Sequence, residues 1–260
     1  MAGTKPGHDE RWDEQMAEKS GKKLTGRIAA DRVRMQSTPK PPPGAVERFL
    51  ALGECTSLIS DVMDELGVPE GVIGASTLKP TLPGKLICGP ALTVRNITQR
   101  SDPFVAAQKN ANRMAEFEAH NLAEDGDVLV ISGVAGMSNM GGISAYTGQR
   151  QGERGAIVMG GVRDVRHSRS IDYPIWASEI TPVTGKWRLE TVEINGEIQM
   201  GEVRVNPGDL VVADDTGVVF IPRESIMAVL ELCEKKKQGE DTRIDAISRG
   251  VPVPVFYGKG

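Results

Sequence analysis

Three short apolar runs in the middle of the chain constrain its fold more than any other feature of the sequence. They occupy residues 127–132 (DVLVIS), 155–159 (GAIVM) and 173–177 (YPIWA). Continuous apolar runs of this length are typical of parallel strands that are buried on both faces. Residues 143–151 and the stretch that ends near Ser170 favour helices between these strands. The pattern therefore predicts a β-α-β-α-β unit, whose crossovers are right-handed in nearly all proteins.

Antiparallel strands are expected after this unit. Residues 189–194 and 197–205 alternate apolar and polar side chains around Asn195-Gly196, and such a pair is the strongest short-range hairpin signal. Further elements are expected as two strands and a terminal helix, at residues 209–213, 217–221 and 223–237. The chain is thus predicted to have an α/β fold with a central parallel sheet and a second, antiparallel sheet.

The region before the parallel unit predicts two helices and one strand. Residues 55–66 (CTSLISDVMDEL) repeat apolar residues on one helical face, with Thr or Ser available as a cap and Gly67 at the end. Residues 85–97 predict a strand that is interrupted at Gly89-Pro90. Residues 103–121 predict a single helix with its apolar face turned inward.

Residues 1–43 differ from the α/β domain expected over residues 44–260. They carry nine Lys/Arg and six Asp/Glu residues and end in a proline cluster that forms a stiff linker. Apolar residues at loose helical spacing predict a helix within residues 9–35, and hence a helical arm. Such an arm would pack on its own domain or on a neighbouring subunit, dock onto a different protein, or stay a flexible tail.

Charge and residue counts exclude several classes of protein. The net charge of −4 lacks the basic excess of a nucleic-acid binder, and no apolar run is long enough to span a membrane. The first residues lack the apolar core of a secretory signal. Three cysteines far apart favour buried, inert thiols and a cytoplasmic setting. Only three histidines are present, never two close together, so any bound metal should be oxygen-ligated, such as Mg²⁺ or Mn²⁺.

Two glycine-rich loops follow the first two parallel strands, at residues 133–142 and 160–164. Ligands of open parallel sheets bind outside the carboxyl ends of the strands, so both loops are expected to face one pocket. Helices starting just beyond the loops would point free N–H groups and partial positive charge into that pocket. The loops therefore predict a site for a small carboxylate or phosphate, although tight turns without a ligand would show the same glycines.

Arg163-Asp164 would place two charged side chains beside this pocket. An arginine can hold a carboxylate or an enolate oxygen through two parallel hydrogen bonds. An aspartate can bind a hard cation directly or through water. An adjacent Arg and Asp are more often a solvated surface pair, so the position after a strand and Gly-Gly is what favours a functional role.

The residues that carry a family resemblance lie between residues 45 and 234. GAIVMGGVRDV, preceded by MGGISA and followed by PGDLVVADDTGVVFIP, resembles the RraA-like family. TSLISDVMDELG, GPALTVR and EDGDVLVIS occur in the expected order before them. That family includes the 4-hydroxy-4-methyl-2-oxoglutarate aldolases, which are metal-dependent pyruvate aldolases. The resemblance implies a swivelling β/β/α three-layer fold that assembles as a homotrimer or homohexamer, with the active site between subunits.

The resemblance also implies residue roles. Arg163 and Asp164 would be catalytic: Arg163 would bind pyruvate and stabilise its enolate, and Asp164 would lie at the Mg²⁺ or Mn²⁺ ion. Main-chain amides of the glycine loop would hold the pyruvate carboxylate, around Asn139, Met140, Gly141, Gly142 and Ile143. The expected reaction is cleavage of a C–C bond of a 2-oxo acid, with oxaloacetate decarboxylation as a side activity. Two alternatives remain open: a non-catalytic regulator that binds a protein partner, and a lyase for a different sugar acid.

Two positions depart from the family pattern. The acidic residue expected before the Arg-Asp pair is Gly142 in this chain, and the residue before Gly-Gly, often Asp in relatives, is Met159. Glu153, Glu179 and an acidic group of a neighbouring subunit are candidates to compensate for the lost negative charge. His167, about one helical turn after Asp164, is a further candidate base or a solvated side chain.

Overall fold

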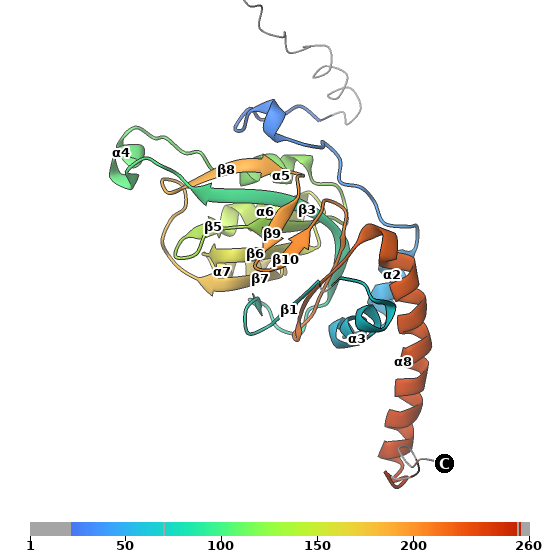
Figure 1. Ribbon diagram of the computed structural model, residues 1–260. Coiled ribbons are helices and arrows are strands. Elements are labelled where there is room, and N and C mark those ends of the chain that lie inside the picture. The colour runs from blue at the N-terminus through green and yellow to red at the C-terminus, as the bar shows by residue number, and fades with distance from the viewer. Residues whose placement is uncertain (1–21, 70, 254, 256–260) are drawn as a thin grey trace, which may run out of the picture.

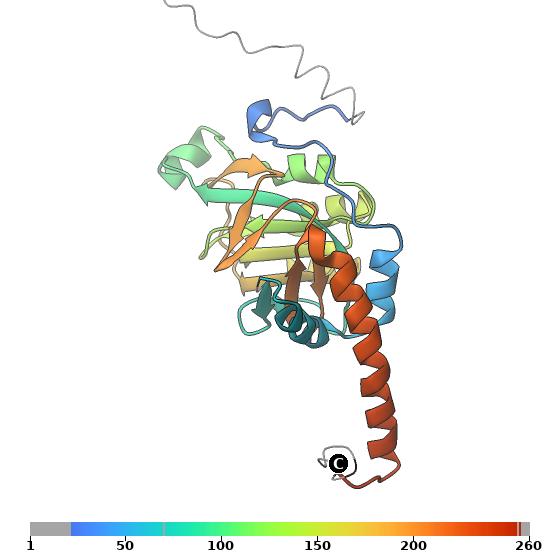
Figure 2. The same cartoon turned by 45° about the vertical axis from the view of Figure 1, so that its right-hand side comes forward.

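The computed structural model describes residues 22–69, 71–253 and 255, and Figures 1 and 2 show it from two directions. A large mixed sheet forms the body. Its strands are β1 (Val72–Gly74), β2 (Lys79–Pro80), β3 (Ile87–Thr98), β4 (Val128–Ser132), β5 (Ser138–Met140), β6 (Gly155–Val162), β7 (Ile175–Ile180), β8 (Leu189–Ile194), β11 (Leu210–Ala213) and β12 (Gly217–Ile221). A small separate sheet pairs β9 (Ile198–Met200) with β10 (Val203–Val205).

Helices flank this sheet, and the last of them runs away from the body of the molecule (Figure 2). They are α2 (Ala45–Ala51), α3 (Thr56–Leu66), α4 (Pro103–Gln108), α5 (Glu116–Leu122), α6 (Gly142–Arg150), α7 (Val165–Ser170) and α8 (Ile226–Ser248). In the part of the chain that the structure describes, no helix is both long enough and apolar enough to cross a membrane.

The predicted parallel unit is confirmed. β4 pairs in parallel with β3 on one side and β6 on the other, and β6 pairs in parallel with β7. Helices α6 and α7 form the crossovers between these strands, as their sequences indicate. The carboxyl ends of β4, β6 and β7 therefore meet at one edge of the sheet.

Strand β3 joins the parallel and antiparallel parts into one sheet. Residues 87–90 pair with β11 in antiparallel register, and residues 91–95 pair with β4 in parallel register. The predicted interruption at Gly89-Pro90 is wrong, because the strand continues through both residues. Gly89 is required there by close packing, since a Cβ would lie 2.1 Å from the carbonyl oxygen of Gly126.

The predicted hairpin around Asn195-Gly196 is also wrong. Asn195 does adopt the left-handed conformation of a turn (φ 52°). The strands on either side separate, however, because β8 pairs with the free side of β3 while β9 pairs with β10. A neighbouring strand from elsewhere in the sequence thus competes successfully with the local partner.

The helix predicted over residues 103–121 is two short helices, α4 and α5. Asn110 lies between them in the left-handed region (φ 50°), which no continuous helix tolerates. The Asn112 side chain then accepts a hydrogen bond from the Met114 amide (3.0 Å) and so favours a turn over a helix.

The described part of the N-terminal arm packs on its own domain. The predicted helix is wrong for residues 22–35, which contain only a 3₁₀ turn at Ala30–Arg32, and residues 9–21 lie outside the described residues. Val33 forms a bridge with Ile194, and the Thr25 amide donates to the Glu118 carboxylate (2.8 Å). These contacts satisfy backbone groups of the arm without a helix.

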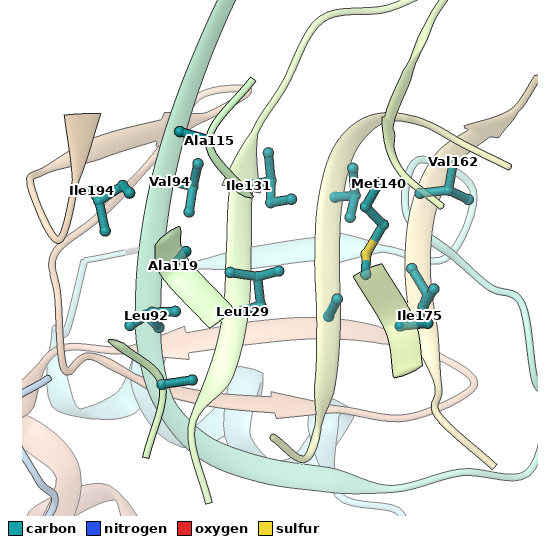
Figure 3. Close-up of a cluster of buried hydrophobic side chains, with 14 of the residues drawn as sticks. Leu92, Val94, Ala115, Ala119, Leu129, Ile131, Met140, Val162, Ile175 and Ile194 are labelled. Carbon is teal, nitrogen blue, oxygen red and sulfur yellow. The ribbon is translucent and has the colours of Figure 1, made fainter. Parts of the chain in front are cut away.

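One hydrophobic core lies between the parallel part of the sheet and helices α5 and α6. Figure 3 shows Leu92 and Val94 of β3 and Leu129 and Ile131 of β4, with Ala119 of α5 beside them. All five are fully buried. Close packing of this kind holds the carboxyl ends of the parallel strands in fixed positions.

A second core lies between the antiparallel part of the sheet and helices α2, α3 and α8. The three cysteines are buried and unpaired, which confirms the prediction of inert thiols. Burial raises the pKa of the Cys55 and Cys233 thiols to about 12, so neither forms a thiolate near neutral pH.

Candidate active site

The two segments predicted to share a pocket do lie together. The Arg163 amide donates to the Met140 carbonyl (3.2 Å), and the Gly142 amide donates to Oδ2 of Asp164 (3.2 Å). The pairing of β5 with β6 brings the end of the first glycine loop beside the end of β6. Residues 138–143 and Arg163-Asp164 are therefore at the same edge of the sheet.

Gly160 and Gly161 do not form the predicted loop. Both lie within β6, which extends to Val162, so the turn at the end of the strand begins at Arg163. At both glycines it is neighbouring protein atoms, and not a ligand, that leave no room for a side chain. A Cβ on Gly160 would lie 2.4 Å from Nδ2 of Asn139, and a Cβ on Gly161 would lie 2.6 Å from the Met137 carbonyl oxygen.

A cavity of about 420 Å³ opens at this edge of the sheet. Met140, Gly141, Gly142, Ile143, Arg163 and Asp164 all line it, as the sequence predicts. The other lining residues come from the N-terminal arm, from the segment around α5, from β5, from α6 and from the loop before β8: Arg27, Asn110, Asn112, Met114, Glu116, Phe117, Ser138, Ser144, Thr184, Gly185, Lys186 and Trp187.

Asp164 is held in a backbone conformation that few side chains adopt. Its φ of 58° and ψ of 31° place it in the left-handed region, immediately before α7. Non-glycine residues in this region are uncommon and concentrate at functional sites. Its carboxylate lies 3.6 Å from Nε of Arg163, and both side chains are partly exposed. The strained turn thus presents a guanidinium and a carboxylate together to the cavity.

Asn139 does not line the cavity. Its side chain is fully buried and ties the glycine loop together: Nδ2 donates to the Val134 carbonyl (2.9 Å) and Oδ1 accepts from the Val134 amide (3.1 Å). Asn96 of β3 donates to the same oxygen (3.3 Å). The position of Asn139 therefore suits a residue that shapes the loop rather than one that contacts a ligand in the cavity.

Helix α6 begins at the cavity wall. Its first residue is Gly142, and the helix has no side-chain cap. The amides of Ile143 and Ser144 belong to its first turn, whose N–H groups have no partner within a helix. They direct donors and partial positive charge towards a ligand in the cavity.

His167 explains why position 142 is glycine in this chain. A Cβ at Gly142 would lie 2.5 Å from Nδ1 of His167, so the histidine ring occupies the space that a side chain at position 142 would need. Met159, the other departure, is not among the lining residues of the cavity. Its methyl group instead lies beside Gly201, in the turn between β9 and β10.

The sequence model of the RraA-like family, described as Aldolase/RraA, matches residues 56–220. The chain belongs to the RraA-like family. A relative from Halalkalibacterium halodurans, named "Putative 4-hydroxy-4-methyl-2-oxoglutarate aldolase", is 32% identical over 198 residues, which are 75% of this chain and 86% of the relative. Protein DlpA of Legionella pneumophila is 29% identical over 192 residues, which are 74% of this chain but only 30% of DlpA.

Solved structures agree with this membership. RraAS2 of Streptomyces coelicolor, described as an unusual member of the RNase ES inhibitor RraA protein family, is 25% identical with a TM-score of 0.66, covering 79% of this chain and 98% of RraAS2. An uncharacterized protein of Pseudomonas syringae pv. tomato has a TM-score of 0.68 at 22% identity, covering 82% and 96%, and this likeness concerns the fold alone. The resemblance read from the sequence and the predicted α/β fold are both confirmed.

This RraA-like chain has a buried carboxylate in the cavity that the sequence did not single out. Glu116, in the first turn of α5, is 9% exposed, and its Oε2 has no hydrogen-bond partner among the described residues. Burial raises the pKa of this carboxyl, while a backbone hydrogen bond and the nearby charges of Arg27 and Lys186 lower it to a smaller extent. A buried carboxylate with an unsatisfied oxygen at a cavity wall is a candidate functional group.

The acids considered as replacements for the family carboxylate have other partners in this RraA-like chain. Glu153 is buried and accepts hydrogen bonds from His120 (2.7 Å) and Tyr173 (2.6 Å). Glu179 accepts from the Gly136 amide (2.6 Å) in the glycine loop. Within the described residues, Glu116 and Asp164 are therefore the carboxylates that line the cavity.

Replacing Glu116 with glutamine should stabilise the RraA-like fold increasingly as the pH rises. A carboxyl whose folded-state pKa is raised contributes most stability below its unfolded-state pKa and loses that contribution as the pH rises through the folded-state pKa. Glu116→Gln removes this loss, so its unfolding free energy should gain on the wild type over a range of pH that begins near the ordinary glutamate pKa of about 4 and extends upward. Urea unfolding across this range tests it, with the exposed Glu202→Gln as control; a difference that is constant with pH would contradict it.

Proposed function

We propose that the chain is a divalent-metal-dependent lyase that cleaves a C–C bond of a 2-oxo acid through a pyruvate-type enolate. The observation that carries the proposal is the convergence of Arg163, Asp164 and the first amides of α6 on one cavity. This set combines a planar cation, a carboxylate and main-chain donors, which are the groups that an enolate-forming reaction needs. Membership of the RraA-like family supports it.

The donor set fits a hard cation rather than a soft one. Among the described residues there is no cluster of three or more His, Cys, Asp or Glu side chains that could hold a metal ion. Mg²⁺ commonly binds through one or two carboxylates and keeps several waters, so it does not need such a cluster. Both contacts of the Asp164 carboxylate use Oδ2, which leaves Oδ1 for a cation. Bound there, Mg²⁺ or Mn²⁺ would polarise the 2-oxo group of the substrate.

The protein residues would hold the substrate and its developing charge. The amides of Ile143 and Ser144 would bind the carboxylate of the pyruvate part at the start of α6. The Arg163 guanidinium would donate to the 2-oxo oxygen as the C–C bond breaks and negative charge collects there. Arg27 and Lys186 add positive charge to the cavity wall, which favours an acid with a second anionic group.

Assembly as a homotrimer or homohexamer is part of the proposal. Several large apolar side chains near this edge of the sheet are exposed: Phe104 at 75%, Ile143 at 76%, Tyr146 at 48% and Ile180 at 60%. Ile143 also lines the cavity. Large apolar side chains that are this exposed favour an interface with another chain. A neighbouring subunit covering them would close the cavity from one side.

Pyruvate release from 2-oxo acids tests the proposal. Oxaloacetate and 4-hydroxy-2-oxo acids should release pyruvate with Mg²⁺ or Mn²⁺, and a chelator should abolish the release. Asp164→Asn should weaken the response to added metal by about tenfold or more, because it removes one charged ligand while Asn still tolerates the left-handed backbone. Release that persists in chelator, or an unchanged metal response in the variant, would contradict the metal dependence.

A regulatory role is the second candidate. RraAS2, the similar structure from Streptomyces coelicolor, is described as a member of an RNase ES inhibitor family. The sequence offered the N-terminal arm as the docking segment, but its described residues 22–43 pack on the chain's own domain. Binding of a ribonuclease by a chain that releases no pyruvate from any of these acids would favour this second role.

A further inference from the structure

A continuous run of buried hydrogen bonds leads from the cavity wall into the interior. Oγ of Ser144 lies 2.6 Å from Nε2 of His120, and Nδ1 of His120 lies 2.7 Å from Oε1 of Glu153. The Tyr173 hydroxyl donates to the other oxygen of Glu153 (2.6 Å). The four residues come from α6, α5 and the segments just before β6 and β7, so tertiary packing assembles the run.

Only the Ser144 end of this run reaches the cavity. Ser144 lines it, whereas His120, Glu153 and Tyr173 are not among its lining residues. Ser144 is 3% exposed, and the side chains of His120 and Glu153 are completely buried. A buried carboxylate and imidazole cost desolvation free energy that apolar residues of similar size would not. Packing alone therefore gives no reason for a serine, a histidine and a glutamate in this order.

The hydrogen-bond partners of Glu153 indicate which groups in this run carry protons. Burial and the neighbouring Glu153 raise the pKa of Tyr173 well above its ordinary value, so its hydroxyl stays protonated and donates. Glu153 thus accepts from Tyr173 on one oxygen and from Nδ1–H of His120 on the other. In a neutral ring Nε2 of His120 is then the unprotonated nitrogen, 2.6 Å from the Ser144 hydroxyl whose hydrogen bond it would accept. This is the order of a hydroxyl, a base and an orienting acid.

We propose that Ser144 is the acid–base group of the cavity, and that His120 and Glu153 are positioning residues that take up and return its proton. The proposal rests on the proposed lyase function and adds the proton acceptor that it lacks. Glu116, one helical turn before His120, is the competing candidate, because it is the other buried acid–base group at the cavity wall. Variants of Ser144 and of Glu116, compared in two reactions of the same enolate, separate the two candidates.

In the proposed step, the proton of the substrate 4-hydroxyl ends on C3 of the product. The 4-hydroxyl of a 4-hydroxy-2-oxo acid gives its proton to Oγ of Ser144, while Ser144 gives its own proton to Nε2 of His120. The bond between C3 and C4 breaks, C4 becomes the carbonyl carbon of the released fragment, and the electron pair forms the enolate. The imidazolium faces the Glu153 carboxylate until its proton returns through Ser144 to C3, which yields pyruvate.

Comparing two reactions of the same enolate tests this role. Retro-aldol cleavage needs a base for the substrate hydroxyl, whereas oxaloacetate decarboxylation forms the enolate by loss of CO₂ and has no such hydroxyl. Ser144→Ala should therefore lower the ratio of retro-aldol to decarboxylation kcat by roughly 10²-fold or more. Glu153→Gln should lower the same ratio with little change in KM. Thr147→Ala is the matched control, because its hydroxyl lies on the same helix and bonds to the Ile143 carbonyl.

The outcomes distinguish the relay from the lyase function. If Ser144→Ala keeps the wild-type ratio of retro-aldol to decarboxylation kcat, the relay is overturned but the lyase function is not. If Glu116→Gln lowers that ratio and Ser144→Ala does not, Glu116 is the base. A wild-type chain that releases no pyruvate overturns the lyase function and with it the relay. Matching unfolding midpoints exclude a folding defect, and an equal fall of both reactions in such a variant overturns the relay.

Nuclear magnetic resonance gives a readout that does not depend on turnover. The chain has only three histidines, so ¹⁵N-histidine labelling with a His120→Gln spectrum for assignment identifies the ring of His120. We expect a proton on Nδ1 with a strongly downfield shift and an unprotonated Nε2. A ring protonated on Nε2, whether neutral or doubly protonated, would overturn the relay, because it could not accept the serine proton.

Discussion

Arg163→Ala should lower pyruvate release by roughly 10²- to 10³-fold, the size of effect seen when a preorganised donor to a developing oxyanion is removed. The guanidinium is one-third exposed at the cavity and 3.6 Å from Asp164, so it takes no part in the buried cores. Removing it takes away the cation beside the 2-oxo oxygen and leaves the fold in place. The loss should affect retro-aldol cleavage and oxaloacetate decarboxylation alike, since both pass through the same enolate.

Arg163→Lys is the matched variant for this prediction. A lysine keeps the positive charge but cannot make two parallel hydrogen bonds, so most of the loss should persist. Size-exclusion chromatography and thermal unfolding should show the same assembly and midpoint for wild type and both variants. Wild-type turnover of oxaloacetate by Arg163→Ala would remove the central residue of the proposed function.

The meeting of the two segments at one sheet edge could be predicted, because it follows from the order of strands and helices along the chain. Apolar runs of strand length with short helices between them require parallel pairing, and parallel pairing places the segments after those strands at one edge. Arg163, Asp164 and Gly142 could thus be expected to meet before any coordinates. Glycine pairs were harder to interpret: Gly160 and Gly161 looked like a ligand loop, but they serve close packing inside β6.

The remainder of the cavity could not be predicted, because it depends on contacts between distant segments. Glu116 and His120 lie on a short helix whose sequence reads as part of a longer one, so nothing in the pattern points them towards Ser144 and Glu153. The hairpin prediction failed for a similar reason, since β8 pairs with β3 about a hundred residues earlier. Local signals fix elements, whereas partners are chosen by competition across the whole sheet.

Position 142 departs from the family pattern, and the structure shows which side chain lies beside it. The sequence alone registers a missing carboxylate, while the structure shows that a Cβ at this position would meet the side chain of His167. The histidine and the glycine are twenty-five positions apart, and only the meeting of α6 and α7 links them. The carboxyl groups that line the cavity are those of Asp164, before α7, and Glu116, on α5.

Gly160→Ala should destabilise the fold by about 3 kcal/mol or more and reduce lyase activity along with it, because strain and overcrowding act at the same residue. The φ of Gly160 is 153°, a value that side chains rarely adopt. A Cβ would lie 2.4 Å from Nδ2 of Asn139 and 3.0 Å from the Val134 carbonyl oxygen. Asn139 is fully buried and cannot move aside without losing its bonds to the glycine loop.

Gly136→Ala separates the two causes, because it lies in the same loop. Its φ of 76° imposes strain on alanine, but a Cβ there would meet no atom within 4 Å. We expect a loss of only about 1–2 kcal/mol for this control and near-normal turnover of the remaining folded protein. Urea unfolding and pyruvate release from both variants decide the matter. If Gly160→Ala were no less stable than Gly136→Ala, the loop that carries the cavity amides would not depend on the contact between Gly160 and Asn139.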